Sequence, residues 1–173
     1  MTDVDKALSL VRTVPDFPSP GVLFRDLNPL FASPWAFRAV IEAMAARLPA
    51  DVDVIAAVEA RGFILGGALA VMSDRALVPI RKPGKLPVVA DRVDYALEYG
   101  NATLELPGGV LPPGARVAVV DDVLATGGTV AGVCQLVERA QASVSVVMVV
   151  LDLAALGGRD RLGDRKIHAL QTI

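Results

Sequence analysis

Two adjacent acids, Asp121 and Asp122, precede the short run Ala125–Thr129, which reads Ala-Thr-Gly-Gly-Thr. A glycine-rich turn that leads into a helix presents unpaired N–H groups and the positive end of the helix dipole. Such a turn is an anion site, and phosphate matches it best. Carboxylates beside a phosphate suit neutral hydroxyls or a metal-bound ligand. Together these residues predict a ligand with a phosphate at one end and a polyol beside it, which describes a ribose 5-phosphate.

Two other kinds of phosphate loop are excluded by spacing. A Walker A loop needs Gly-x-x-x-x-Gly-Lys followed by Ser or Thr, whereas Gly84-Lys85 precedes Leu86. A dinucleotide fingerprint needs Gly-x-Gly-x-x-Gly after a strand, and that spacing does not occur in the chain. The remaining alternative is an ordinary strand, turn and helix that carries its acids on the surface.

Further cations could serve the same ligand. Glu59-Ala60-Arg61-Gly62 stands between a predicted strand and a predicted helix, which makes a second anion site. A guanidinium there can pair with phosphate through two hydrogen bonds. The turn Arg81–Lys85 places three cations within five residues with no acid among them, which indicates that an anion visits it. The plainer alternatives are a helix cap with a surface arginine and a solvated basic turn.

The elements that must position these residues follow from hydrophobic periodicity. Apolar, β-branched runs predict buried strands, and spacings of three and four predict helices. Strands that alternate with helices imply an α/β fold, a mostly parallel central sheet flanked by helices. The carboxyl edge of such a sheet binds ligands, and both loops fall there. The predicted strands are 54–58, 76–80, 117–120, 144–151 and 166–171; the predicted helices are 3–13, 34 to about 48, 63–72 and 130–139; a proline-rich loop spans 14–21, an irregular segment 86–94, and a two-stranded ribbon 95–98 with 102–106.

Composition narrows the class of protein. The 173 residues suit one domain, and a hydrophobic content of 53% suits a sheet buried on both faces with an apolar surface left for an oligomer. A formal charge of −2 gives no support for binding to nucleic acid or to a membrane surface. One cysteine and one histidine exclude an intrachain disulfide and a His/Cys metal cage. Without an apolar amino-terminal signal, the expected location is the cytoplasm.

Several motifs together resemble a known family. Val119–Thr129 is similar to the signature of type I phosphoribosyltransferases, which bind 5-phosphoribosyl 1-diphosphate (PRPP), and its form DD-x-L-ATGGT resembles that of adenine phosphoribosyltransferases. Segment 81–87 resembles the family's RK-x-GKLP, and segment 95–100 its Y-x-LEYG. Segment 18–26 resembles P-x-PG-x-x-FRD, and segment 153–162 resembles L-x-x-L-x-GR-x-x-L. The signature alone indicates the superfamily, and the LEYG and FRD segments point to adenine.

The resemblance implies an enzyme of purine salvage that converts adenine and PRPP to AMP and diphosphate. It implies one domain over 1–173, with hood elements at about 14–31 and a lid at about 82–100. It further implies a homodimer and the cofactor Mg²⁺, held mainly by PRPP and water with no protein ligand. The implied catalytic residues are Glu98 and Arg61; the implied PRPP- and AMP-binding residues are Asp121, Asp122, Ala125, Thr126, Gly127, Gly128, Thr129, Arg81, Lys82 and Lys85; the implied adenine-binding residues are Leu23, Phe24, Arg25 and Val123.

Departures from the pattern leave alternatives open. Val123 stands where leucine is common, and residues 88–94 diverge from the expected lid. Cys134 and His168 are expected to be structural. One alternative is an enzyme with the same core that uses xanthine, hypoxanthine or guanine. A second is a non-catalytic regulator that senses PRPP or a nucleotide, and a third is another Mg-dependent phosphotransferase.

Overall fold

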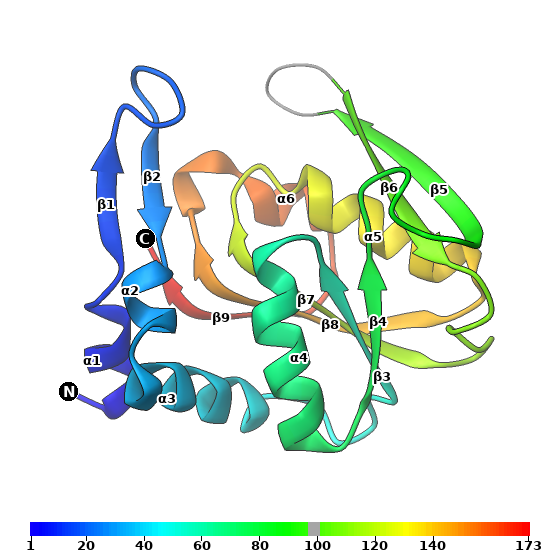
Figure 1. Ribbon diagram of the computed structural model, residues 1–173, viewed down its shortest axis with the longest axis horizontal. Coiled ribbons are helices and arrows are strands. Elements are labelled where there is room, and N and C mark those ends of the chain that lie inside the picture. The colour runs from blue at the N-terminus through cyan, green and yellow to red at the C-terminus, as the bar shows by residue number, and fades with distance from the viewer. Residues whose placement is uncertain (97–100) are drawn as a thin grey trace. The chain divides into compact units, whose positions relative to one another are not determined.

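The computed structural model describes residues 1–96 and 101–173 (Figure 1). The contacts within the chain divide it into two compact units, Met1–Ala46 and Arg47–Ile173. The first unit carries short helices and a hairpin, whereas the second carries a parallel sheet and a separate ribbon. That the whole chain acts as one domain stays a prediction.

A capping box starts the first helix of the first unit. The Thr2 hydroxyl accepts a hydrogen bond from the Asp5 N–H at 3.2 Å, while the Asp5 carboxylate accepts one from the Thr2 N–H at 2.7 Å. This helix ends at Leu8, so the predicted helix over 3–13 is too long. The reason is competition, because Arg12 already belongs to a strand that pairs with the segment ending at Asp26.

The hairpin of this unit joins two strands in an antiparallel register. Arg12 lies opposite Asp26, and their side chains form an ion pair at 2.7 Å. The last helix begins at Pro34 as predicted and ends at Ala45, and the side chain of its N-cap residue Ser33 makes no capping hydrogen bond. The elements of the first unit are α1 (Asp3–Leu8), β1 (Arg12–Pro15), β2 (Leu23–Asp26), α2 (Asn28–Phe31) and α3 (Pro34–Ala45).

The sheet of the second unit runs in the order β4-β3-β7-β8-β9, and each neighbouring pair is parallel. This arrangement confirms the predicted fold class. Strand β3 is followed in the chain by β4, its neighbour on one side in the strand order, whereas β7 is followed by β8, its neighbour on the other side. The strand order therefore reverses between β3 and β7, and such a topological switch point is where α/β proteins bind ligands. The elements are β3 (Val54–Val58), α4 (Arg61–Ser73), β4 (Ala76–Ile80), β5 (Val89–Ala96), β6 (Asn101–Pro107), β7 (Arg116–Leu124), α5 (Gly128–Arg139), β8 (Ser143–Asp152), the 3₁₀ turn η1 (Ala154–Leu156), α6 (Gly158–Leu162) and β9 (Ile167–Thr172).

Helices cover both faces of this sheet, as Figure 1 shows for α4 and α5. Val58 belongs to the core shared with α5, whereas Ala57 faces α4, because neighbouring strand residues point to opposite sides. A Cβ atom on Gly66 of α4 would lie 2.5 Å from the Cβ of Ala57, so only glycine fits that contact. The close packing of α4 against β3 therefore depends on Gly66.

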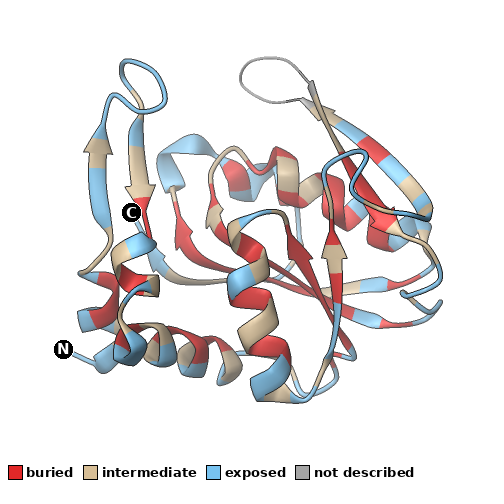
Figure 2. Cartoon of the chain, in the orientation of Figure 1, coloured by how far each residue is buried: buried red, intermediate tan, exposed pale blue. Residues whose placement is uncertain are grey.

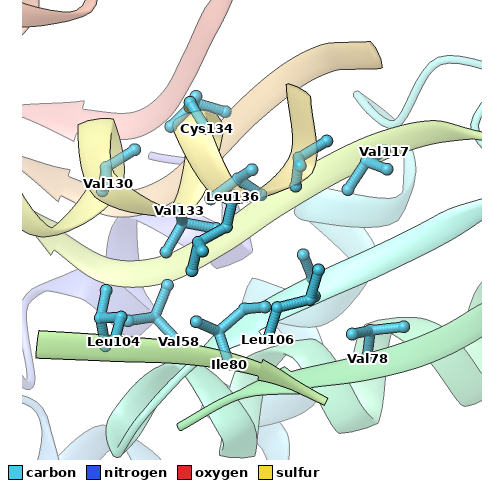
Figure 3. Packing of buried hydrophobic residues seen from close by; sticks show 14 of the residues in the cluster. Val58, Val78, Ile80, Leu104, Leu106, Val117, Val130, Val133, Cys134 and Leu136 are labelled. Atoms are coloured by element: carbon cyan, nitrogen blue, oxygen red, sulfur yellow. The ribbon is translucent and has the colours of Figure 1, made fainter. Parts of the chain in front are cut away.

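The main core lies between the sheet, α5 and the ribbon. Figure 2 shows the middle strands buried along most of their length, and Figure 3 shows Val133 and Leu136 of α5 beside Leu104 and Leu106 of β6. Cys134 is packed in this core, where burial raises the pKa of its thiol to about 11. The thiol is therefore an apolar packing group, as expected from the sequence.

The ribbon of β5 and β6 corrects one prediction. Residues 86–94 were expected to be irregular, yet β5 begins at Val89 and pairs antiparallel with β6. Exposed residues alternate in β5 with partly or fully buried ones, and Val93 packs into the core. The charged residues Asp91, Arg92 and Asp94 break the hydrophobic alternation in the sequence, which concealed the strand.

Candidate active site

Two loops meet at the switch point between β3 and β7. The strands are in register from Val54 opposite Val117 to Ala57 opposite Val120, so their carboxyl ends and the loops beyond them lie side by side. Arg61 opens α4 after β3, and Asp121 and Asp122 lie in the last part of β7. The acids therefore stand within the strand rather than after it.

A glycine allows the two loops to approach. A Cβ atom on Gly62 would lie 2.8 Å from the carbonyl oxygen of Val120 and 3.2 Å from Oδ1 of Asp121. No larger residue fits there without moving one of the loops. The Glu59–Gly62 loop is thus held against the acid pair by its backbone as well as by charge.

Arg61 and Asp122 form the ion pair at the centre of the site. Arg61 Nε lies 2.9 Å from Asp122 Oδ2, with the Asp122 side chain 6% exposed and the Arg61 side chain 35% exposed. Asp121 Oδ1 accepts a hydrogen bond from the Asp122 N–H at 2.8 Å. Arg61 therefore partly neutralises one acid while about a third of its side chain remains accessible to solvent and to an anion.

Burial shifts the ionisation of both acids. It raises the pKa of Asp121 well above the usual value, and the neighbouring Asp122 carboxylate raises it further. Burial also raises the pKa of Asp122, although Arg61 works in the opposite direction. The charged forms of these two carboxyls are therefore destabilised in the folded protein, and carboxyls with raised pKa values are typical of functional sites.

The ATGGT loop (Ala125–Thr129) joins β7 to α5 and surrounds a small cavity. The cavity has a volume of about 60 Å³ and is lined by Asp121 and residues 123–130, including Val123. Gly127 caps α5 with a φ of 78°, a conformation that favours glycine, and this residue provides no side-chain cap for the helix. The first N–H groups of α5 are therefore available to an anion.

A second cavity of about 260 Å³ lies between β5, α5 and α6. Tyr95 lines it from the ribbon, Gln135 from α5 and Arg161 from α6. Gly128 borders both cavities, so the second one extends the surface around the ATGGT loop.

The basic turn Arg81–Lys85 corrects the interpretation that no acid relieves its charge. Glu59 Oε2 lies 3.0 Å from Arg81 Nε and accepts from the Lys82 N–H at 2.8 Å. Hydrogen bonding from Lys82, together with Arg81, keeps the pKa of Glu59 below its usual value. The guanidinium of Arg81 also lies over the Phe63 ring at 5.5 Å.

Buried Glu105 of β6 supports the same turn, since its Oε2 accepts from the Gly84 N–H at 3.2 Å. Arg81 thus has a structural partner, whereas Lys82 and Lys85 are exposed. Within the described residues, neither lysine lies within 4.0 Å of a carboxylate oxygen in an ion pair. The ammonium groups of Lys82 and Lys85 are therefore available to bind an anion.

The residues expected to hold a base are divided between the two units. Leu23, Phe24 and Arg25 form most of β2 in the first unit, where the Phe17 and Phe24 rings pack edge to face with centroids 5.1 Å apart. Arg25 hydrogen-bonds to the Thr13 hydroxyl. Val123 belongs to the second unit, and Glu98 lies outside the described residues.

Sequence reasoning missed several polar residues that shape the site. Glu105 and Asp152 are buried carboxylates, and Arg159 Nε lies 2.5 Å from Asp152 Oδ2. A signal was present, because an acid inside a run of apolar strand residues needs a partner. His168, expected to be structural, has its Nδ1 3.0 Å from the Arg47 carbonyl oxygen.

Neither a metal cage nor a membrane span is found in the described part of the chain. No group of three or more His, Cys, Asp or Glu side chains is arranged there to hold a metal ion. No helix in residues 1–96 and 101–173 is both long and apolar enough to cross a bilayer.

The sequence matches the family model of the phosphoribosyl transferase domain over residues 30–168. An adenine phosphoribosyltransferase of Saccharopolyspora erythraea is 57% identical over 166 residues, which are 96% of this chain and 90% of the relative. Another, from Clavibacter michiganensis, is 50% identical over 98% of this chain and 96% of its own length.

Solved structures agree with the sequence relatives. A crystal structure of adenine phosphoribosyltransferase from Thermoanaerobacter pseudethanolicus superposes with a TM-score of 0.95 at 38% identity and covers 98% of this chain and 99% of its own. The Saccharomyces cerevisiae enzyme, complexed with an imino-altritol bisphosphate and adenine, gives a TM-score of 0.93 at 34% identity, with 98% of each chain covered.

Proposed function

The chain belongs to the phosphoribosyl transferase family, and on that premise we propose that it transfers the 5-phosphoribosyl group of PRPP to adenine in purine salvage. The products are AMP and diphosphate. One observation carries the proposal: the Asp121–Asp122 pair stands between the ATGGT loop and Arg61 at the switch point. These three features match the phosphate, ribose and diphosphate of PRPP in order.

Each part of PRPP has a chemically matched partner in the second unit. The open amides at the start of α5 suit the 5′-phosphate, and the acid pair suits the ribose hydroxyls. Arg61 suits the diphosphate, assisted by the exposed Lys82 and Lys85. A charge-assisted hydrogen bond of this kind contributes about 1.5–3 kcal/mol.

Adenine is proposed as the acceptor on the basis of the β2 segment and of the relatives' names. Phe24 would stack on the purine ring, an interaction worth about 1–3 kcal/mol per base in related settings. Backbone groups near Leu23, together with Arg25, would read the edge of the base. Val123 is proposed as the adenine-binding residue of the second unit. A 6-oxopurine accepts a hydrogen bond where adenine donates, so it would leave buried polar groups unpaired.

The transfer itself separates charge. As the bond from C1 to diphosphate breaks, positive charge develops on the ribose, where the carboxylates of Asp121 and Asp122 can stabilise it. Arg61, Arg81, Lys82 and Lys85 would stabilise the leaving diphosphate. Glu98 would handle the purine proton, and closure of the lid at about 82–100 would exclude the water that hydrolyses PRPP.

Magnesium belongs to the proposal as a companion of PRPP. Mg²⁺ keeps several waters and is commonly bound through substrate phosphates. Asp122 forms an ion pair with Arg61. This pairing is consistent with Mg²⁺ held mainly by PRPP and water rather than by a protein carboxylate. When bound there, Mg²⁺ supplies neutralisation of charge on the diphosphate oxygens.

A base-competition assay tests this function. Purified protein, PRPP and Mg²⁺ are mixed with adenine, hypoxanthine, guanine or xanthine, and nucleotide formation is followed by chromatography. We expect AMP to form from adenine and the other three bases to give little or no nucleotide. Chelation of Mg²⁺ should stop the formation of AMP. Preference for another base would favour the alternative acceptors, and no nucleotide from any base would favour a regulator.

We also propose the homodimer and the cytoplasmic location expected from the sequence. Residues 62–73 of α4 carry no charged side chain. This helix nevertheless exposes three large apolar side chains, Ile64, Val71 and Met72, and Val71 is 87% exposed. Leu77, in the following strand β4, is exposed as well. An apolar helix face of this kind is typical of an interface between subunits.

Val71→Asp is expected to convert the dimer to a monomer, because it places a charge at the most exposed apolar position of α4. Sedimentation velocity at micromolar concentration measures the change. Val110→Asp is the matched control, since Val110 is also exposed but lies in the connector before β7. A wild-type protein that sediments as a monomer would contradict the proposed interface.

A further inference from the structure

The turn between η1 and α6 lies directly against the ATGGT loop. A Cβ atom on Gly158 would overlap the Ala125 carbonyl oxygen and lie 3.1 Å from the Gly127 nitrogen. Conversely, a Cβ atom on Gly127 would lie 2.6 Å from the Gly158 carbonyl oxygen. Side-chain carbons do not approach a backbone so closely. Each glycine is therefore required by the backbone of the other segment.

This contact sets the orientation of a peptide in the loop. The C=O and N–H groups of a trans peptide point in opposite directions. Because the Ala125 carbonyl oxygen lies against Gly158, we infer that a trans peptide directs the Thr126 N–H to the side of the loop opposite Gly158. The turn at Gly158 thereby fixes which side of the loop presents this donor.

The turn is itself anchored to the sheet by charge. Arg159 Nε donates to Asp152 Oδ2 at 2.5 Å, and the Asp152 side chain is fully buried at the end of β8. Asp152 lies opposite Leu124 in the pairing of β8 with β7, and the Leu153 N–H donates to the Leu124 carbonyl at 2.9 Å. The residue before the loop and the turn that supports the loop are thus tied to the same strand end.

We propose that Asp152, Arg159 and Gly158 are positioning residues for phosphate binding. The buried carboxylate holds Arg159, Arg159 holds the turn, and Gly158 holds the ATGGT loop in the shape that presents its amides. If the loop already has its binding conformation before the ligand arrives, no free energy of binding is lost to ordering it. The inference rests on the proposed role of the ATGGT loop as the 5′-phosphate site and extends it to residues that touch no ligand.

Binding of two separate ligands distinguishes positioning from general stability. Ribose 5-phosphate probes the ATGGT loop, whereas inorganic diphosphate with Mg²⁺ probes the side of Arg61. Gly158→Ala should weaken binding of ribose 5-phosphate by about tenfold to a hundredfold, the loss expected when one charge-assisted hydrogen bond to the phosphate is no longer formed. Its effect on diphosphate binding should stay within about twofold, and isothermal titration calorimetry measures both dissociation constants.

The neighbouring glycine provides the matched control. Gly157 has a φ of 66°, which asparagine tolerates, and among the described residues a Cβ atom there would meet only Asp160 Oδ2, at 3.7 Å. Gly157→Asn should therefore leave both dissociation constants unchanged. If Gly158→Ala does not fold, Asp152→Asn keeps the shape of the side chain and removes the charge that holds Arg159. It should also weaken ribose 5-phosphate binding selectively.

An ion pair at the amino end of β7, the end of the strand opposite to the site, controls for loss of charge. Arg116 Nη2 lies 2.9 Å from Asp53 Oδ1, and Arg116→Ala should spare both ligands. Equal losses for ribose 5-phosphate and diphosphate in Gly158→Ala and Asp152→Asn, or no loss for either, would overturn the positioning role. Wild-type protein that binds diphosphate but not ribose 5-phosphate would instead overturn the proposed phosphate site, and this inference with it.

Discussion

Asp121→Asn is expected to make the protein more stable and less active at neutral pH. Burial and the adjacent Asp122 carboxylate raise the pKa of Asp121, so folding disfavours its charged form. The amide oxygen of asparagine can still accept the hydrogen bond from the Asp122 N–H. The substitution should add about 0.5–2 kcal/mol to the free energy of unfolding, as stabilising changes at functional sites commonly do.

The sign of the pH dependence follows from the same shift. A carboxyl whose pKa is higher in the folded state favours folding most when it is protonated, at pH values below its unfolded pKa. That contribution is lost as the pH rises through the folded pKa. The advantage of Asp121→Asn in denaturant unfolding should therefore be large at neutral pH and vanish in acid.

Activity should move in the opposite direction. Loss of a charged acceptor for a ribose hydroxyl should lower kcat/KM for PRPP by about tenfold to a hundredfold. Asp164→Asn, at an exposed position, is the control and should change neither stability nor activity. A variant with full activity would count against the ribose assignment, and one that is less stable at neutral pH would count against the electrostatic account.

Glu98→Gln is expected to lower kcat far more than it changes the KM for PRPP. Glu98 lies outside the described residues, and its role comes from the resemblance of residues 95–100 to the Y-x-LEYG motif. A positioned general acid or base typically contributes 10²- to 10⁴-fold to a rate, so a loss of about that size is expected.

Steady-state kinetics across a range of pH values measure this effect. The variant should lose one limb of the pH profile of kcat, because the group that titrates has been removed. Glu42→Gln, on an exposed position of α3, serves as the control for the loss of one carboxylate. Turnover equal to that of the wild type would remove Glu98 from the mechanism.

Two strands of the sheet and the signature were the parts that the sequence predicted well. The buried strand Val54–Val58 and the edge strand Ala76–Ile80 have the predicted bounds, because each is a short apolar run between polar residues. The ATGGT loop also lies at the carboxyl end of a central strand as predicted. In such places local preference and burial act in the same direction, so a pattern suffices.

Tertiary contacts decided the places where the pattern failed. Helix α1 stops at Leu8 because Arg12 pairs with Asp26, a partner that helical spacing cannot reveal. Arg81 pairs with Glu59, a partner far from it in the sequence that the basic turn by itself does not reveal. Gly158 belonged to a recognised motif, yet only its contact with Ala125 shows why glycine is needed.

A crystal structure with AMP bound tests the central claim most directly. The 5′-phosphate should accept hydrogen bonds from main-chain amides of the ATGGT loop at about 2.7–3.2 Å. The ribose hydroxyls should lie against Asp121 and Asp122, with Arg61 left facing the vacated diphosphate position. A phosphate bound at Arg61 or at the 81–85 turn, with the ATGGT loop empty, would contradict the account.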